Sequence, residues 1–251
     1  MPAVAPVTPT GLPERPDLSR LAALDGLPLL SRAEDGATWP MLLWVPGESM
    51  RMISTAVLGG GLAEREWVLN AQVPPGYPRR DPAAHLAAMA ASLGVRGDGV
   101  GLMTAARVAD RGCAADDGVV ALVTAGLGVR GWAAAPAPGR PGPPPAGTVN
   151  IVVSVPVPLG DAALVNAVAT VTEAKVQALR DAGIDASGTP TDAVCVAAAR
   201  PVPGRAAEPF AGPRSVWGAR IARAVHRAAY EACVRGEADG GRHGDGRLST
   251  P

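Results

Sequence analysis

The segment from Gly147 to Ala199 constrains the fold of this chain more than any other stretch. An apolar, β-branched run opens it, a second apolar run closes it, and a long pattern with helical spacing lies between them. This arrangement predicts a strand–helix–strand unit. The helix is expected to begin at Asp161, acting as N-cap, and to end at Gly183, because glycine tolerates the left-handed conformation that often ends a helix.

One cation lies on the apolar side of this predicted helix. With about 100° of rotation per residue, Lys175 falls near the middle of that side, and it is the only lysine in a chain whose other basic residues are 22 arginines and three histidines. A lysine there either extends its ammonium to the edge of the helix or is buried with a partner. Two interpretations stay open: a structural ion pair with a buried carboxylate, and a functional ammonium. The apolar side is predicted to hold Leu164, Val168, Val171, Thr172, Val176 and Leu179.

Length, charge and hydropathy limit the classes of protein to consider. A chain of 251 residues, 47% of them apolar, can form one large domain or two small ones with a sizeable core. The formal net charge is zero, so no nucleic-acid or anionic-membrane partner is indicated. No apolar run reaches about 18 residues and the chain does not open with a signal-peptide pattern. We therefore expect no membrane association and a cytoplasmic location, while the oligomeric state stays unknown.

The cysteines and histidines show no metal-binding pattern. The three cysteines are far apart, no CxxC pair exists, and the three histidines lack the spacing of metal ligands. We therefore expect neither a disulfide framework nor a metal site. Cys195 lies in a predicted buried strand and is interpreted as a small core residue rather than a nucleophile.

Apolar runs separated by turn residues predict the other strands and two further helices. The turn chemistry of residues 46–49 predicts a hairpin between the first two strands, and the polar loop 110–118 predicts one between the fourth and fifth. The fold class is therefore α+β, a single domain with a mixed, largely antiparallel sheet covered by helices. A four-layer α/β sandwich with two sheets is the alternative topology. The expected strands cover 41–45, 51–57, 67–73, 100–106 and 119–127, and the expected helices run from Asp81 to Gly94 and from Ser215 to Val234.

Composition also suggests where ordered structure begins and ends. Residues 1–25 are rich in proline without a period and are expected to form a flexible leader. The domain is expected to cover residues 26–234, with a Pro/Ala/Gly loop at 133–146. Residues 235–251 form a polar, glycine-rich tail that is expected to be disordered.

Several polar or flexible residues near the predicted strand ends are candidates for substrate binding. Three glycines, at 59, 60 and 61, follow a strand and can expose backbone N–H groups to a ligand, although such a triplet more often forms a tight turn. The motif lacks the spacing of a phosphate-binding loop or a dinucleotide fingerprint. The candidate side chains are Asn70, Thr104, Thr124 and Asn150, and the candidate glycines are Gly59, Gly60 and Gly61.

An ordered set of short motifs resembles one known family. In chain order these motifs are Ser54-Thr55-Ala56, Gly59-Gly60-Gly61, Val68-Leu69-Asn70, Gln72-Val73, Asp81-Pro82, Gly101-Leu102-Met103-Thr104-Ala105-Ala106, Val123-Thr124-Ala125-Gly126-Leu127, Gly147-Thr148-Val149-Asn150-Ile151, Thr172-Glu173-Ala174-Lys175, Gly188-Thr189-Pro190-Thr191-Asp192 and Phe210-Ala211-Gly212-Pro213. Each motif alone is weak, but the ordered set closely resembles the adenosylcobinamide amidohydrolases of corrinoid salvage, over roughly residues 40 to 234. The sequence departs from the family pattern after Leu127, where Gly128-Val129-Arg130 replaces an expected Asn-containing turn.

The resemblance implies a reaction and a substrate. Enzymes of this family hydrolyse the amide that joins the aminopropanol arm to the corrin ring of adenosylcobinamide, and the product, adenosylcobyric acid, re-enters coenzyme B12 synthesis. The corrinoid would then be a small-molecule substrate, and no cofactor is expected. A corrinoid-binding protein without hydrolytic activity and a hydrolase of another amide are the alternatives.

The residues available for amide hydrolysis are hydroxyls, a carboxylate and an ammonium. The reaction needs a nucleophile or activated water, a proton shuttle and stabilisation of an oxyanion. Thr191 and Asp192 lie in a turn that leads into the strand after the Lys175 helix, and Thr148 and Thr189 are close to the same strand ends. Lys175, Asp192 and Thr191 are therefore the candidate catalytic residues.

Overall fold

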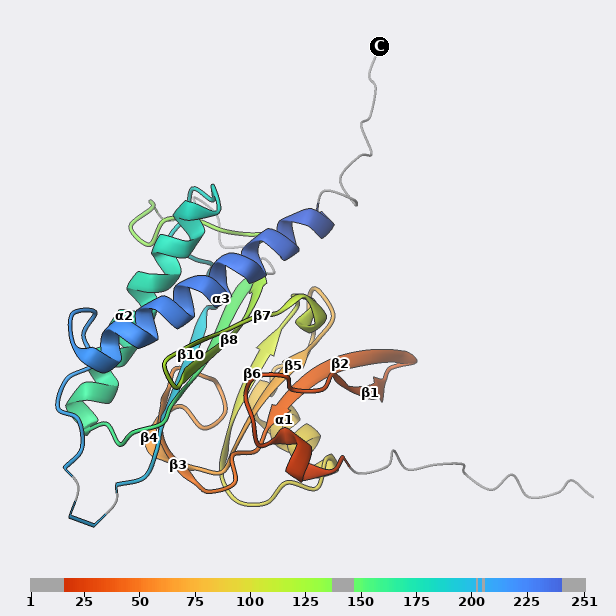
Figure 1. The fold of residues 1–251 in the computed structure, drawn as a ribbon. Coiled ribbons are helices and arrows are strands. Elements are labelled where there is room, and N and C mark those ends of the chain that lie inside the picture. The colour runs from red at the N-terminus through yellow and green to blue at the C-terminus, as the bar shows by residue number, and fades with distance from the viewer. Residues whose placement is uncertain (1–15, 137–146, 202, 205, 241–251) are drawn as a thin grey trace, which may run out of the picture.

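A computed structural model describes residues 16–136, 147–201, 203–204 and 206–240 (Figure 1). The described helices are α1 (Pro82–Ser92), α2 (Asp161–Asp181) and α3 (Val216–Gly240), with short 3-10 turns at Leu18–Leu21 and Val108–Asp110. The strands are β1 (Leu30–Glu34), β2 (Ala37–Trp44), β3 (Met50–Ser54), β4 (Gly61–Arg65), β5 (Trp67–Gln72), β6 (Gly99–Thr104), β7 (Gly112–Asp116), β8 (Val119–Gly126), β9 (Thr148–Val155) and β10 (Ala193–Ala198).

The strands form two sheets that pack against each other. One sheet has four strands in the order β1-β2-β5-β6, and the other has six in the order β4-β3-β10-β9-β8-β7. Within the described residues, the pairs β5–β6 and β9–β10 are parallel and the other pairs are antiparallel. The α+β class and the largely antiparallel pairing are confirmed, and the presence of two sheets corresponds to the alternative topology.

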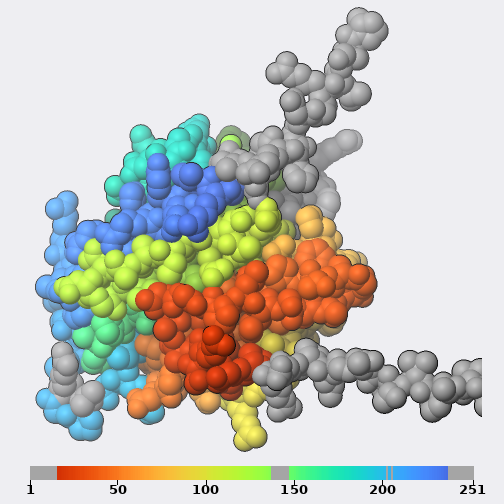
Figure 2. Space-filling model, turned by 45° about the vertical axis from the view of Figure 1, so that its right-hand side comes forward, coloured from red at the N-terminus to blue at the C-terminus, as the bar shows by residue number. Residues whose placement is uncertain are grey.

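The helices cover the outer faces of the two sheets. Helices α2 and α3 lie together on the six-stranded sheet, and α1 packs against β5 and β6 of the four-stranded sheet (Figure 1). Figure 2 shows the same layering on the surface, with α3 in blue, the β7–β8 region in green and the N-terminal strands in orange as successive bands. One apolar core lies between the helices and the six-stranded sheet, and a second includes the space between the sheets.

Both predicted hairpins are wrong, because the paired strands belong to different sheets. β2 joins the four-stranded sheet and β3 the six-stranded sheet, although only residues 45–49 separate them. Likewise β6 and β8 are in different sheets, and β8 pairs instead with β7, which lies within the segment 110–118 that was predicted as a loop. β1 and β4 were also not predicted.

The strand–helix–strand unit is confirmed as β9–α2–β10. Seven of the eight β9 residues are buried, because α2 and α3 cover one face of this strand and the four-stranded sheet covers the other. Helix α2 begins with Gly160 as N-cap rather than Asp161, and Gly183 follows its end at φ 76°. The buried face of α2 consists of Ala163, Leu164, Ala167, Thr170, Val171, Ala174, Lys175, Ala178 and Leu179.

The predicted position of Lys175 on the buried face is confirmed, but two neighbours were misplaced. Thr172 is exposed and Val176 is half-buried, since α2 approaches the sheet through its alanines. Small side chains allow a helix backbone to come close to a sheet. The part of α2 that contacts the sheet is therefore the edge of the predicted apolar face that carries the alanines.

The described residues include positions on both sides of the predicted domain. Leu21 and Leu24 lie in the core at 1% and 4% exposure, and Trp44 donates a hydrogen bond to the Ala22 carbonyl, so part of the predicted leader is packed against the sheet. Helix α3 continues to Gly240, beyond the predicted end at Val234. Most of the predicted leader, most of the 133–146 loop and the end of the predicted tail lie outside the described residues.

Asp116 provides a pH-dependent clamp between β7 and α3. Its carboxylate accepts hydrogen bonds from Arg223 at 2.6 and 3.0 Å and from Arg227 at 3.0 Å, which lower the pKa of Asp116 from 3.8 to about 2. Because the pKa of Asp116 is lower in the folded state than in the unfolded state, its ionised carboxylate stabilises the fold at pH values above the unfolded-state pKa. This contribution to stability is lost as pH falls from about 4 to about 2.

We therefore expect Asp116→Asn to be less stable than the wild type at neutral pH, with the difference shrinking as pH falls through that window. Thermal melts at a series of pH values measure this. A difference in melting temperature that stays constant down to about pH 2 would contradict the clamp.

Candidate active site

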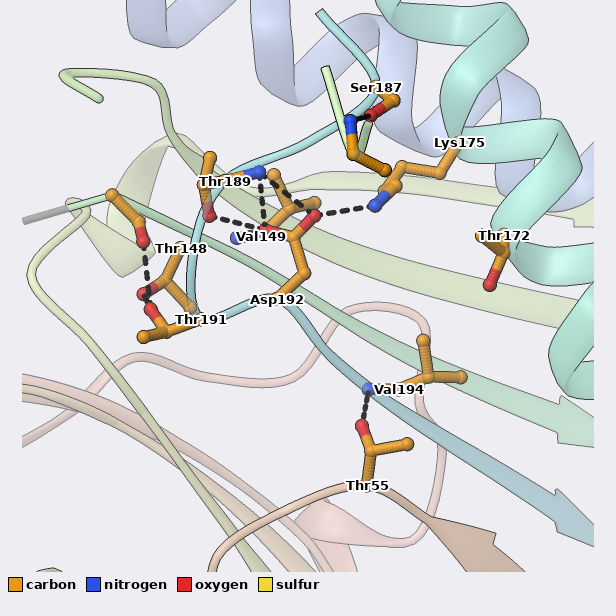
Figure 3. A network of polar contacts seen from close by, with 12 residues as sticks. Thr55, Thr148, Val149, Thr172, Lys175, Ser187, Thr189, Thr191, Asp192 and Val194 are labelled. Carbon is orange, nitrogen blue, oxygen red and sulfur yellow. Dashed lines mark hydrogen bonds and ion pairs between the residues drawn. The ribbon is translucent and has the colours of Figure 1, made fainter. Parts of the chain in front are cut away.

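The candidate catalytic residues meet where the parallel pair β9 and β10 begins. Ala193, the first residue of β10, is paired with Asn150 near the start of β9. Helix α2 connects the end of β9 to the beginning of β10 and runs antiparallel to both strands, so its C-terminal half lies near the ends at which the strands begin. Lys175, on that half of α2, therefore lies beside Asp192, the residue directly before β10 (Figure 3).

Lys175 and Asp192 form a largely buried ion pair. Lys175 Nζ lies 2.5 Å from Asp192 Oδ2, and the two side chains are 11% and 15% exposed. A lysine is rarely buried without a partner, so this pair resolves why the cation is found on the apolar face. It makes the ammonium an immediate neighbour of the carboxylate.

Asp192 also organises the loop before β10. Its Oδ1 accepts the Val149 backbone N–H at 2.9 Å and the Thr189 N–H at 3.2 Å, and the Thr189 hydroxyl donates to the same oxygen (Figure 3). Oδ2 is shared between Lys175 and the Thr189 N–H. The carboxylate is therefore held in one orientation, with four donor groups around its roughly four lone-pair sites.

Thr191 lies on the other side of the same turn. Its hydroxyl donates to the Gly147 carbonyl at 2.8 Å and lies 2.5 Å from the Thr148 hydroxyl. Because Thr191 uses its proton on Gly147, Thr148 is the donor in the contact between the two hydroxyls. The threonine–aspartate corner is thus fixed to the first residues of β9.

A second polar cluster joins the two sheets. Asn150 of β9 donates to Asn70 Oδ1 of β5 at 2.9 Å and to the Met103 carbonyl of β6 at 3.1 Å, while Asn70 donates to Thr124 of β8 at 3.0 Å. Asn70, Thr124 and Asn150 are 2%, 0% and 1% exposed. The structure therefore brings together three of the predicted substrate-binding residues.

One cavity connects the two polar groups. It has a volume of about 310 Å³ and is lined by Thr55, Ala56, Val57, Gly101, Leu102, Met103, Asn150, Thr191, Asp192 and Ala193. The cavity thus lies between the β3–β4 connection, the middle of β6 and the beginnings of β9 and β10. Lys175 is not among these residues, so its ammonium acts on the cavity through Asp192.

Thr55 is a cavity residue that was not predicted as part of the site. Its hydroxyl oxygen accepts the Val194 N–H at 3.0 Å, and its own N–H donates to the Val194 carbonyl at 2.9 Å (Figure 3). These bonds hold the residue directly after β3 against β10. The motif Ser54-Thr55-Ala56 was the available signal, but an exposed hydroxyl after a strand has no periodicity that marks it.

The predicted glycine triplet lies outside this cavity. A Cβ on Gly59 would be 2.0 Å from the Gly99 carbonyl oxygen, and one on Gly60 would be 2.5 Å from the Ala56 oxygen. Close backbone packing therefore explains both glycines, and Gly61 opens β4 with φ 87°. Gly59 lines a different hollow of about 360 Å³, and a substrate contact by any of the three stays a prediction.

Thr104 and Cys195 are both buried in the protein. The Thr104 hydroxyl accepts the Ala106 N–H at 3.0 Å and the residue is 2% exposed, so its contact with substrate stays a prediction. Burial raises the pKa of the Cys195 thiol to about 12. Because the thiolate is the nucleophilic form of cysteine, Cys195 is suited to the core.

Neither a metal-ligand cluster nor a membrane-spanning helix is found in the described part of the chain. Among those residues, no three His, Cys, Asp or Glu side chains gather as metal ligands would. In the same residues, no helix combines the length and hydropathy needed to cross a membrane. The expectations about metals, cofactors and cellular location stay predictions.

Comparison with known proteins identifies the family. The model of the adenosylcobinamide amidohydrolase family matches residues 27–240. An adenosylcobinamide amidohydrolase of Methanosarcina mazei is 34% identical over 140 residues, which cover 56% of this chain and 66% of that protein. A crystal structure of the PH0078 protein from Pyrococcus horikoshii OT3 has a TM-score of 0.46 at 13% identity, and the match covers 83% of this chain and 82% of that chain. The match across 27–240 includes every strand and helix described above, and the chain belongs to the adenosylcobinamide amidohydrolase family.

Proposed function

We propose that this protein hydrolyses the amide between the aminopropanol arm and the corrin ring of adenosylcobinamide, giving adenosylcobyric acid for coenzyme B12 salvage. Family membership supports the reaction class. The observation that supports a particular site for this reaction is the cavity lined by Asn150, Thr191 and Asp192. It brings polar side chains from β9 and from the loop before β10 to one place beside β6.

The size of the cavity supports cleavage of an arm rather than enclosure of the whole substrate. Pockets that bury drug-sized ligands measure roughly 300–1,000 Å³, and the cavity of about 310 Å³ is at the lower end of that range. An amide with its aminopropanol group fits such a volume, but a corrin macrocycle does not. The ring therefore stays at the mouth of the cavity, where Thr55 and Val57 are exposed.

The proposed reaction adds water across the amide. Asp192 accepts a proton from water as the water oxygen bonds to the carbonyl carbon, and the proton then passes to the amide nitrogen as the carbon–nitrogen bond breaks. The products are a carboxylate and a protonated aminopropanol. In this scheme Asp192 is a catalytic residue, Thr191 contacts the reacting group, and Lys175, which does not line the cavity, positions the Asp192 carboxylate.

Incubation of the purified protein with adenosylcobinamide in ¹⁸O-labelled water tests the proposal. We expect adenosylcobyric acid and aminopropanol in equal amounts, with one ¹⁸O atom in the new carboxylate. Binding of the corrinoid without either product would instead show a corrinoid-binding protein. A panel of other amides as substrates separates this activity from a hydrolase of a different amide.

Gly188→Ala tests the position of the ion pair without removing any of its charged groups. A Cβ at this position would be 2.3 Å from Asp192 Oδ2 and 2.6 Å from Lys175 Nζ. Displacement of a catalytic group by 1 Å can cost about 100-fold in rate, so we expect a fall in turnover of about that size. Steady-state turnover of adenosylcobinamide measures it.

Gly131→Ala is the matched control for this prediction. Gly131 donates its N–H to the Gly188 carbonyl at 3.0 Å, and a Cβ on it would meet no atom within 4 Å. We expect this variant to retain wild-type turnover. Equal turnover in both variants would show that the exact placement of Asp192 and Lys175 does not matter for the reaction.

A further inference from the structure

The Asn150 side chain has an acceptor that the described part of the chain does not use. Its Oδ1 atom is buried and has no hydrogen-bond partner among the described residues. Leaving such an acceptor unpaired is costly, and unpaired buried polar atoms are rare in native structures. Because Asn150 lines the cavity, a ligand that enters the cavity can supply the missing donor.

The neighbours of Asn150 determine which of its atoms is the free one. The Met103 carbonyl is an acceptor, so the amide nitrogen of Asn150 must face it. The same nitrogen also donates to Asn70 Oδ1, so both hydrogens of the Asn150 amide are used. Rotation of the amide by 180° would put an oxygen against the Met103 carbonyl, and the free group is therefore an acceptor.

We propose that Asn150 Oδ1 accepts the N–H of the scissile amide and so makes this site selective for amides that carry an N–H over amides whose nitrogen carries none. The inference rests on the proposed amide hydrolysis. The scissile bond of adenosylcobinamide is a secondary amide with one N–H, and the lining of the cavity places Asn150 together with Thr191 and Asp192. One hydrogen bond to that N–H fixes the plane of the amide and turns one face of its carbonyl towards the attacking water.

This hydrogen bond strengthens as the reaction proceeds. The nitrogen gains a proton and positive charge as the carbon–nitrogen bond breaks, and hydrogen bonds from charged donors are roughly twice as strong as neutral ones. An interaction that is stronger in the transition state raises kcat rather than only lowering KM. Asn150 is thus a residue for both selectivity and rate.

The test compares two substrates with two proteins. The substrates are adenosylcobinamide and its analogue methylated on the scissile amide nitrogen, and the proteins are the wild type and Asn150→Leu. In the wild type we expect kcat/KM to be about 10- to 100-fold lower for the N-methyl analogue, the range that corresponds to an unpaired buried acceptor. In Asn150→Leu we expect this preference to disappear, mainly through a lower kcat for adenosylcobinamide.

Thr170→Val is the matched control, because it also removes one buried hydrogen bond. The Thr170 hydroxyl donates to the Ala211 carbonyl at 2.7 Å, and Thr170 is not one of the cavity residues. We expect it to keep the preference for the secondary amide. If Asn150→Leu does not fold, Asn150→Ala gives the same comparison.

The outcomes separate the inference from the proposed function. Absence of hydrolysis of both substrates by the wild type would overturn the proposed function and the inference with it. Hydrolysis of both at equal rates by the wild type would overturn the inference alone. An equal fractional loss on both substrates in the Asn150 variant would overturn it as well, because a purely structural role predicts that result.

Discussion

Asp192→Asn is expected to reduce turnover of adenosylcobinamide by about 10²- to 10⁴-fold, the usual contribution of a general base. An amide at this position keeps an oxygen that can accept the Val149 and Thr189 N–H groups, so the loop before β10 retains its main hydrogen bonds. It cannot take a proton from water, and it removes the partner of Lys175. Steady-state kinetics together with a thermal melt measure the two effects separately.

Asp185→Asn is the control for this prediction. Asp185 lies in the same loop, is exposed, and accepts a hydrogen bond from Trp132 at 3.2 Å, outside the cavity. We expect it to retain full turnover. If Asp192→Asn lowers the melting temperature and leaves turnover unchanged, the ion pair is structural and the catalytic assignment is wrong.

Lys175→Met is expected to reduce turnover by about 100-fold or more and to leave the chain folded. Methionine has similar length and suits the buried face of α2, while Asp192 keeps its hydrogen bonds to Val149 and Thr189. The carboxylate loses the charge that holds Oδ2 in place. Removal of one partner from a fully buried pair costs about 3–5 kcal/mol, and the partial exposure of this pair makes the stability loss smaller.

Two further variants show whether the effect of Lys175→Met is specific to this lysine. Arg180→Met removes an exposed cation from the same helix and is expected to leave turnover unchanged. The double variant Lys175→Met/Asp192→Asn is expected to be about as slow as Asp192→Asn alone, because residues that act as one unit are not additive. Full turnover in Lys175→Met would remove this lysine from the mechanism.

The sequence predicts the local parts of this fold better than the arrangement of the strands. The β9–α2–β10 unit depends on periodicity within about fifty residues, and its helix end at Gly183 and its buried Lys175 are both found in the structure. The choice of sheet for each strand depends on pairing between distant segments. β2 and β3 resemble a hairpin locally, but β3 pairs with β10, about 140 residues later.

The missed strands also have a physical explanation. β1, β4 and β7 lie at the edges of their sheets and are only partly buried. An edge strand buries little of its surface, so it need not show an apolar run or strict alternation. For β7, Gly112-Cys113-Ala114-Ala115-Asp116 has too little apolar character to be distinguished from a loop.

The candidate site could be predicted in part. Residues on the same strand–helix–strand unit, Lys175, Asp192 and Thr191, were placed together correctly, because parallel strands begin at the same edge. Thr124 lies opposite Asn150 in the β8–β9 pair, and Asn70 meets both through contact between the two sheets, which no local pattern encodes. Thr55 enters the cavity because β3 pairs with β10, which is distant in the sequence.

A structure of Asp192→Asn with adenosylcobinamide bound tests the central claim most directly. The account predicts that the aminopropanol arm lies inside the cavity and that the corrin ring lies at the mouth beside Thr55. The amide nitrogen is then within hydrogen-bond distance of Asn150 Oδ1. The carbonyl carbon lies about 3–3.5 Å from a water held at residue 192, which is close enough for attack. An arm bound in the hollow lined by Gly59, or at any position remote from residue 192, would contradict it.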